Sequence, residues 1–172
     1  DDIHVTGNLG DSFMGLQILK KKISTKKEFD KYFVNKYYQP DVQINLVKNL
    51  LKFANTSIDI SDGLIADLEK MINNQDLSYQ LNEDRIPVSK NLSKLIKDNK
   101  IKKSKMISNG DDYQILFTAN TNKRRIINNT SKILGVKITK IGRINSGVCK
   151  SSIIDQKGKQ ILIKNKGYAH QF

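Results

Sequence analysis

The chain has 172 residues, a net charge of +13 and a single cysteine, Cys149. This length fits one medium-sized domain, and the lone cysteine excludes an internal disulfide and suits a reducing compartment. Because no apolar run approaches the roughly 20 residues that span a bilayer and no signal-peptide pattern is visible, we expect a cytoplasmic protein that needs no membrane.

The positive charge comes almost entirely from lysine, since the chain has only four arginines, at positions 85, 124, 125 and 143. Arginine is the residue favoured for bidentate contacts with phosphates and bases, so the composition argues against a nucleic-acid partner. The lysines gather at 20–22, 26–27 and 100–105, where we expect helix ends and loops. We interpret them as a solvated face. The alternative, a basic binding module, would show a steep loss of binding with added salt.

The first third of the chain predicts one strand followed by three helices. Residues 3–6 are typical of a strand, and a glycine-bearing turn at 7–10 leads into a helix that Asp11 or Ser12 can cap. A second helical pattern covers 28–38 and ends before Pro40. From Asp41 to Ala54 the apolar residues recur at the helical period, which predicts a long amphipathic helix. Those apolar positions are Val42, Leu46, Val47, Leu50, Leu51 and Ala54.

The remainder alternates strands and helices and ends in strands. Helices interspersed with strands and a final meander predict an α/β or α+β domain with a mixed sheet, in one layered unit. The expected strands are 57–60, 77–81, 113–118, 136–144, 147–154 and 159–163, with a hairpin turn at 155–158, and the expected helices lie at 64–71, 89–98 and 122–134.

Common catalytic fingerprints are missing from the sequence. There is no G-x-x-x-x-G-K-[ST] or G-x-G-x-x-G pattern, and with His4, His170 and one cysteine the spacing of a zinc site is unsupported. A Ser-His-Asp triad is not indicated. Carboxylates remain, and they suit a hard cation such as Mg²⁺, which binds oxygen ligands and substrate phosphates.

The turn Asp59-Ile60-Ser61-Asp62-Gly63 joins an expected strand to an expected helix. Two carboxylates there would repel each other unless they share a cation, and the start of a helix offers free N–H groups to a phosphate. This pattern favours a metal-bound phosphate site. The alternative is purely structural, with Ser61 or Asp62 capping the helix.

Two further turns have the same character. Gly110-Asp111-Asp112-Tyr113 precedes a strand, although Asn109-Gly110 is also typical of an ordinary Asx turn. Gly7-Asn8-Leu9-Gly10-Asp11-Ser12 could let the backbone approach a phosphate, or could be a plain capped turn.

Taken in this order, the turns resemble the thiamine-monophosphate kinase family, which makes thiamine diphosphate from thiamine monophosphate and ATP. The matching segments are 5–12, 58–64 with 67–68, 110–118, 141–144 and 167–170, so the resemblance runs the length of the chain. It implies a fold like the C-terminal domain of aminoimidazole-ribonucleotide synthetase. It also implies that residues 1–172 form a single C-terminal domain, and that a separate N-terminal domain supplies much of the Mg²⁺ and ATP site and forms a homodimer.

The resemblance also implies roles for individual residues. Asp59 and Asp62 would ligate Mg²⁺, Ser61 would contact ATP, and Asp111 and Tyr168 would bind thiamine monophosphate. Phosphoryl transfer would be direct, with positioning and charge neutralisation providing most of the catalysis. This chain alone would be inactive or nearly so.

Two departures from the family pattern leave alternatives open. The family usually has Glu-Asp-Tyr-Glu where this chain has Asp111-Asp112-Tyr113-Gln114, and the N-terminal half is not part of this sequence. The enzyme alternatives are relatives within the superfamily: selenophosphate synthetase, aminoimidazole-ribonucleotide synthetase or the hydrogenase-maturation dehydratase. The other alternative is a remnant without catalysis.

Overall fold

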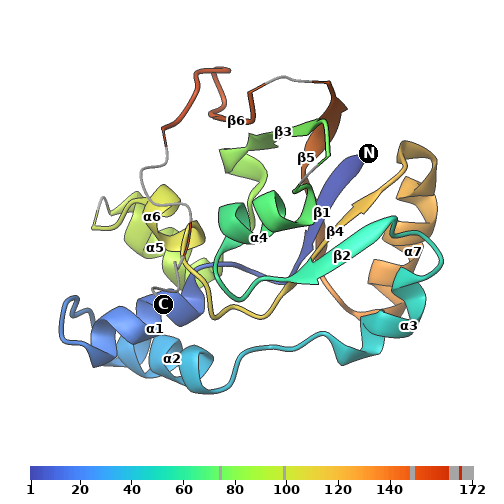
Figure 1. The fold of residues 1–172 in the computed structure, drawn as a ribbon. Helices are drawn as coiled ribbons and strands as arrows, with labels where there is room; N and C mark the ends of the chain where they lie inside the picture. The colour runs from blue at the N-terminus through green and yellow to red at the C-terminus, as the bar shows by residue number, and fades with distance from the viewer. Residues whose placement is uncertain (74, 99, 148–149, 163–166, 168–172) are drawn as a thin grey trace, which may run out of the picture.

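A computed structural model describes residues 1–73, 75–98, 100–147, 150–162 and 167. Six strands form one sheet in the order β2-β4-β1-β5-β3-β6. The pairs are antiparallel except for β3 with β6, which run parallel. The predicted α/β domain with a mixed sheet is therefore confirmed (Figure 1).

The helices and strands follow the predicted order along the chain. The strands are β1 (Asp2–Thr6), β2 (Thr56–Asp59), β3 (Leu77–Asn82), β4 (Ile115–Ala119), β5 (Ile138–Ser146) and β6 (Ser152–Ile154). The α-helices are α1 (Asp11–Leu19), α2 (Lys27–Tyr38), α3 (Val47–Leu50), α4 (Leu64–Met71), α5 (Lys90–Lys97), α6 (Lys103–Ile107) and α7 (Arg124–Leu134). The 3₁₀ helices are η1 (Ile44–Leu46), η2 (Glu83–Arg85) and η3 (Thr121–Lys123).

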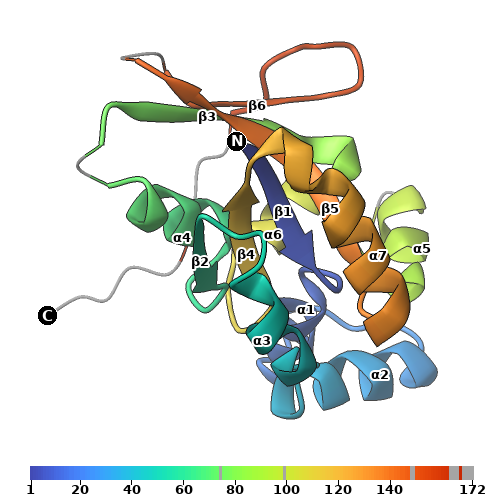
Figure 2. The same ribbon diagram turned by 90° about the vertical axis from the view of Figure 1, so that its right-hand side faces the viewer.

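Strand β1 lies in the middle of the sheet and all five of its residues are buried. Because successive side chains of a strand point to opposite faces, Ile3 and Val5 pack with α4 on one face, while His4 stacks on Phe117 on the other. Helices α3 and α7 cover that second face (Figure 2). The sheet is thus a middle layer between helices, as an apolar sheet with two buried faces requires.

Helices α1, α2, α5 and α6 form a separate layer at one end of the sheet (Figure 1). Met14, Phe33, Leu92 and Met106 pack together there, each with no exposed surface. The turn before α1 and the turn before β4 both lie between this helical layer and the sheet. These two turns are distant in sequence but lie close together in the folded chain.

The predicted helix from Asp41 to Ala54 is wrong in its extent, because only η1 and α3 form within it. The apolar residues do not share one face: Leu46 and Leu50 are buried, whereas Val42, Val47 and Leu51 are 58%, 54% and 91% exposed. A helical period in the sequence therefore did not correspond to a single buried stripe.

Other differences concern strand ends. Strand β4 starts at Ile115, two residues later than predicted, because Tyr113 adopts a positive φ of 50° that no regular strand allows. The predicted strand 159–163 is reduced to a bridge between Gln160 and Ile154, and residue 163 lies outside the described residues. The turn at 155–158 is confirmed by hydrogen bonds that close the loop between Asp155 and Lys159. Helix α6 was not predicted.

No helix within the described part of the chain is long and apolar enough to cross a membrane.

Candidate functional site

The acidic turn at 59–63 and the turn at 110–113 lie directly against each other. Asp111 N–H donates to the carbonyl oxygen of Ser61 at 2.9 Å, and Tyr113 N–H donates to the carbonyl oxygen of Ile60 at 2.9 Å. A third bond of 2.8 Å runs back from Ile60 N–H to the carbonyl oxygen of Gln114. These backbone bonds place the two turns side by side, although about fifty residues separate them in sequence.

Two glycines make this close approach possible. A Cβ atom on Gly110 would lie 1.7 Å from the Ser61 carbonyl oxygen, a distance that no side chain could tolerate. Gly63 has a φ of +131°, and a Cβ there would lie 2.6 Å from the carbonyl oxygen of Ser108. Gly110 therefore allows the two turns to meet, and Gly63 allows the acidic turn to approach the residues just before Gly110.

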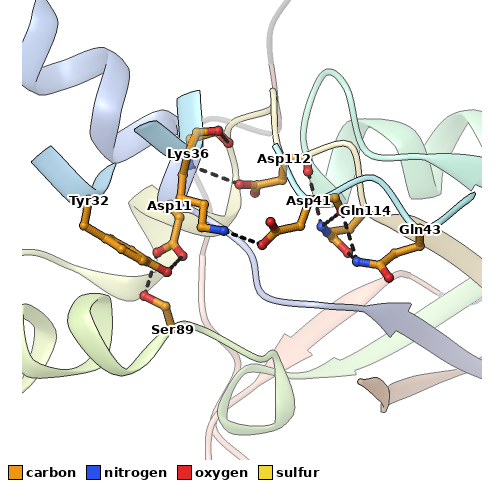
Figure 3. Close-up of polar contacts among 9 residues, drawn as sticks. Asp11, Tyr32, Lys36, Asp41, Gln43, Ser89, Asp112 and Gln114 are labelled. Atoms are coloured by element: carbon orange, nitrogen blue, oxygen red, sulfur yellow. Dashed lines mark hydrogen bonds and ion pairs between the residues drawn. The ribbon is translucent and has the colours of Figure 1, made fainter. Parts of the chain in front are cut away.

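Asp112 connects the third turn to this pair. Its carboxylate accepts hydrogen bonds from Gly10 N–H at 2.7 Å and from Ser12 N–H at 3.3 Å, at the beginning of α1. The side chain is buried, and this burial raises its pKa to about 8, against the lowering effect of the two N–H donors. All three predicted turns thus meet, with Asp112 holding the glycine-bearing turn in place. Asp112 and Asp11 are drawn together in Figure 3.

Gln114 provides a fourth connection through its side-chain amide. Thr6 Oγ1 donates to Gln114 Oε1 at 2.8 Å, and Gln114 Nε2 donates to the carbonyl oxygen of Asp41 at 2.8 Å. The amide therefore acts as both acceptor and donor, which a carboxylate could not do (Figure 3). The expected departure from the family pattern at Gln114 therefore coincides with a hydrogen bond to the Asp41 carbonyl oxygen that needs an amide nitrogen as its donor.

Asp67 determines the shape of the acidic turn. Its Oδ2 accepts hydrogen bonds from the backbone N–H groups of Ser61, Asp62 and Gly63 at 3.0, 3.0 and 3.1 Å, and its side chain is fully buried. Sequence reasoning assigned Asp67 no role. The available signal was an acidic residue in the first turn of a helix, where free N–H groups favour a carboxylate.

The alternative that Ser61 or Asp62 caps α4 is wrong. The residue at the N-cap position is Gly63, and no side chain caps the helix there. Because Asp67 already satisfies the turn's N–H groups, the side chains of Ser61 and Asp62 are not needed for that purpose. Asp62 instead forms an ion pair with Lys70, whose ammonium also contacts Asp67 at 2.8 Å.

The predicted metal ligands lie in different surroundings. Asp59 ends β2 at the edge of the sheet and is exposed, while the Asp62 side chain retains 16% of its exposure. Burial raises the pKa of Asp111, and the negative charge of Asp62 raises it further while Lys20 opposes the shift. The negative charges of Asp62 and Asp111 therefore interact. Within the described residues, no group of three or more His, Cys, Asp or Glu side chains is arranged to hold a metal ion.

Tyr168 lies outside the described residues, so its predicted role stays a prediction. Its neighbour Gly167 is described and lies against the acidic turn: a Cβ there would be 2.4 Å from Cβ of Ala66 and 2.8 Å from the carbonyl oxygen of Asp62. Gly167 therefore lies at the site.

A buried polar cluster beside these turns was also missed. Asp11 accepts hydrogen bonds from Ser89 Oγ at 2.7 Å and from Tyr32 Oη at 2.9 Å (Figure 3). Burial raises the pKa of Asp11, and these two donors oppose the shift. Because Ser89 also caps α5 by accepting from Leu92 N–H at 3.0 Å, the cluster ties α1, α2 and α5 together at the turn.

No protein-family model matches the chain. Individual relatives do. The chain is 36% identical to the thiamine-monophosphate kinase of Buchnera aphidicola from Acyrthosiphon pisum and 34% identical to that of the strain from Schizaphis graminum, in both cases over 99% of this chain and 52% of the relative. The predicted resemblance to the thiamine-monophosphate kinases is confirmed. The chain spans about half the length of these curated relatives.

Solved structures agree with the sequence comparison. A structure described as AaThiL complexed with AMPPCP and TMP has a TM-score of 0.77 and 28% identity, covering 99% of this chain and 51% of that one. The hydrogenase maturation protein HypE of E. coli has a TM-score of 0.73 at 13% identity, over 96% of this chain and 49% of its own. The HypE likeness shows the fold alone. The thiamine-monophosphate kinases therefore match this chain in sequence as well as in fold.

Proposed function

We propose that this chain is the C-terminal domain of a two-domain thiamine-monophosphate kinase. With an N-terminal domain, it would transfer the terminal phosphate of ATP to thiamine monophosphate and form thiamine diphosphate. The observation that carries the proposal is the convergence of the turns at 59–63 and 110–113 in a chain that resembles these kinases over 99% of its length. The N-terminal domain would form the homodimer, and the lone cysteine fits a cytoplasmic enzyme.

The acidic turn would form one wall of a Mg²⁺ and ATP site. Asp59 and Asp62 would hold Mg²⁺ and Ser61 would contact ATP. The oxygen donors suit this cation, and the small number of carboxylates leaves positions for phosphate oxygens, water and ligands from the N-terminal domain. When bound, Mg²⁺ would neutralise charge that develops on the phosphates.

For Asp62 to act as a metal ligand, the ammonium of Lys70 would have to move away from the Asp62 carboxylate. Its side chain is 51% exposed, so its ammonium can move into water when a cation takes its place. The turn keeps its shape when Lys70 leaves, because three backbone N–H groups still bind Asp67. The site is therefore organised before any cation arrives.

Asp111 and Tyr168 would bind thiamine monophosphate opposite this wall. Asp111 has a φ of 69°, which turns the chain beside Ser61, and it is half-buried next to Asp62. Gly167, the residue before Tyr168, lies against the same turn. The shorter Asp111 in place of the usual glutamate would move the carboxylate back by about 1.5 Å, a displacement large enough to alter the rate by roughly 100-fold.

The proposal is tested by adding the N-terminal half of the Buchnera relative, ATP and Mg²⁺ to this chain and measuring thiamine diphosphate by chromatography. We expect product from the mixture and none from the chain alone. No product from a mixture in which the two halves associate would contradict the proposed activity.

A single substitution separates function from structure. Asp62→Asn should lower the reconstituted rate on the order of 100-fold or more while leaving the melting temperature nearly unchanged, because Asp67 maintains the turn. Asp76→Asn, at an exposed position before β3, is the matched control and should change neither. A large fall in the melting temperature of Asp62→Asn would instead indicate a structural role.

A further inference from the structure

A cavity of about 310 Å³ lies where the beginning of α2 meets the end of α5, outside the three turns described above. Its apolar lining consists of Phe29 and Leu95, and Leu95 is only 2% exposed. Both residues belong to the apolar cluster that holds the helical layer together. The cavity is therefore built on the core of this helical layer, which lies at one end of the sheet.

Four lysines from two distant parts of the sequence surround this cavity: Lys26, Lys94, Lys97 and Lys100. We call them the lysine pocket. The cavity lining includes one acidic residue, Asp98, so the local charge is strongly positive. Among the described residues no carboxylate forms an ion pair with any of the four lysines, in contrast to Lys36, Lys70 and Lys140.

The usual reason for lysines at helix ends explains only part of this arrangement. Lys94 and Lys97 lie in the last turn of α5, where a cation interacts favourably with the helix dipole. Lys26 lies at the opposite kind of position, the N-cap of α2, where a cation is unfavourable and no side chain caps the helix. The nearby carboxylate of Asp30 is already bound to Thr25, through its N–H at 3.1 Å and its hydroxyl at 2.6 Å.

An anion bound in the cavity would neutralise part of the positive charge of the four lysines. Ammonium groups bind phosphate as compact point charges, and several of them around a concave surface concentrate the field there. The cavity is at the lower end of the roughly 300–1,000 Å³ typical of small-molecule sites, so it suits a small ligand better than a polymer.

We propose that the lysine pocket binds a small phosphorylated anion carrying two or more negative charges. The ligand's phosphoryl groups contact the lysines, and any apolar part rests on Phe29 and Leu95. This binding does not depend on the proposed kinase activity, because it uses none of the residues of the three turns.

The experiment is an isothermal titration of the whole 172-residue chain with inorganic pyrophosphate, without divalent metal and at an ionic strength of about 0.15 M. We expect saturable binding at one site. The variant Lys26→Gln with Lys97→Gln removes charge from the N-cap of α2 and the last turn of α5, and should weaken binding on the order of tenfold.

The matched control is Lys123→Gln with Lys132→Gln on α7, which changes the same total charge at an N-cap and at a last helical turn. Its affinity should stay within about twofold of the unmodified chain, because these lysines lie far from the pocket. Equal weakening in both double variants would mean a diffuse attraction to net charge and would overturn the proposal, as would the absence of saturable binding.

A third variant locates the bound anion. Asp62→Asn should bind pyrophosphate as the unmodified chain does. If Asp62→Asn changed the affinity while the lysine-pocket variant did not, the anion would bind at the acidic turn and the proposal would be wrong. Circular dichroism melts check that all variants fold, which we expect because the substituted lysines are exposed.

Discussion

Gln114 donates a hydrogen bond from its side-chain nitrogen to the carbonyl oxygen of Asp41, 73 residues earlier in the chain. This bond fixes the segment between α2 and η1 against the turn at 110–114, and Gln43 contacts the same amide from that segment at 3.4 Å. Because the Gln114 side chain is only 3% exposed, any change in its hydrogen-bonding character acts on a buried site.

We therefore predict that Gln114→Glu destabilises the chain by about 1–3 kcal/mol at neutral pH, since a carboxylate would face the Asp41 carbonyl without a proton to donate. The new carboxyl would have a raised pKa in the folded state, so the loss should shrink at acidic pH, where the protonated group can donate. Urea denaturation of both proteins at several pH values measures this difference. An unchanged difference between acidic and neutral pH would contradict the explanation.

The second prediction concerns pH and Asp112. Its folded-state pKa of about 8 lies above the ordinary value of about 3.9. A carboxyl group whose pKa is raised on folding stabilises the folded chain fully at pH values below its pKa in the unfolded chain. This contribution is lost as the pH rises through its pKa in the folded chain. The free energy of unfolding should therefore fall between about pH 4 and pH 8. Asp112→Asn should flatten this decline, and a decline of equal size in the variant would assign it to other groups.

The third prediction concerns Asp67, which binds three backbone N–H groups of the acidic turn. Asp67→Ala leaves these buried donors without a partner and should lower the free energy of unfolding by about 3 kcal/mol. Lys70→Gln removes only the partly exposed ammonium and should cost less, because the three N–H bonds to Asp67 Oδ2 remain. Chemical denaturation of the two variants compares these losses, and similar values would mean that the ion pair, not the N–H bonds, stabilises the turn.

The fourth prediction separates steric from conformational reasons for glycine. Gly110→Ala would place a methyl group 1.7 Å from the Ser61 carbonyl oxygen, so the two turns must move apart and the protein should lose more than about 3 kcal/mol or fail to fold. At Gly135 no atom lies within 4 Å of the position of a new methyl group, so Gly135→Ala meets no steric clash. Its φ of +65° is unfavourable for alanine and should cost about 1 kcal/mol of folding free energy. Thermal melts rank the two variants, and an equal loss would exclude the steric explanation.

The sequence predicted most strands and helices because apolar residues recur at simple periods in elements such as α5, where Leu92 and Leu95 are buried on one face. It failed from Asp41 to Ala54, where Val42, Val47 and Leu51 are apolar but exposed, and no periodicity can distinguish these from core residues. The carboxylates of the site were recognisable from their turns. The roles of Asp67, Asp112 and Gln114 were not, because each binds backbone groups whose positions exist only in the folded chain.

The contacts between Asp112 and the start of α1 join residues separated by 102 and 100 positions along the chain. Closing so long a loop costs conformational entropy before the contact returns any stability, so such contacts form late in folding. We therefore expect the three turns to meet after β1 and β4 have paired in the middle of the sheet. A nascent chain interrupted before Asp112 would hold a nearly complete set of helices and no assembled site.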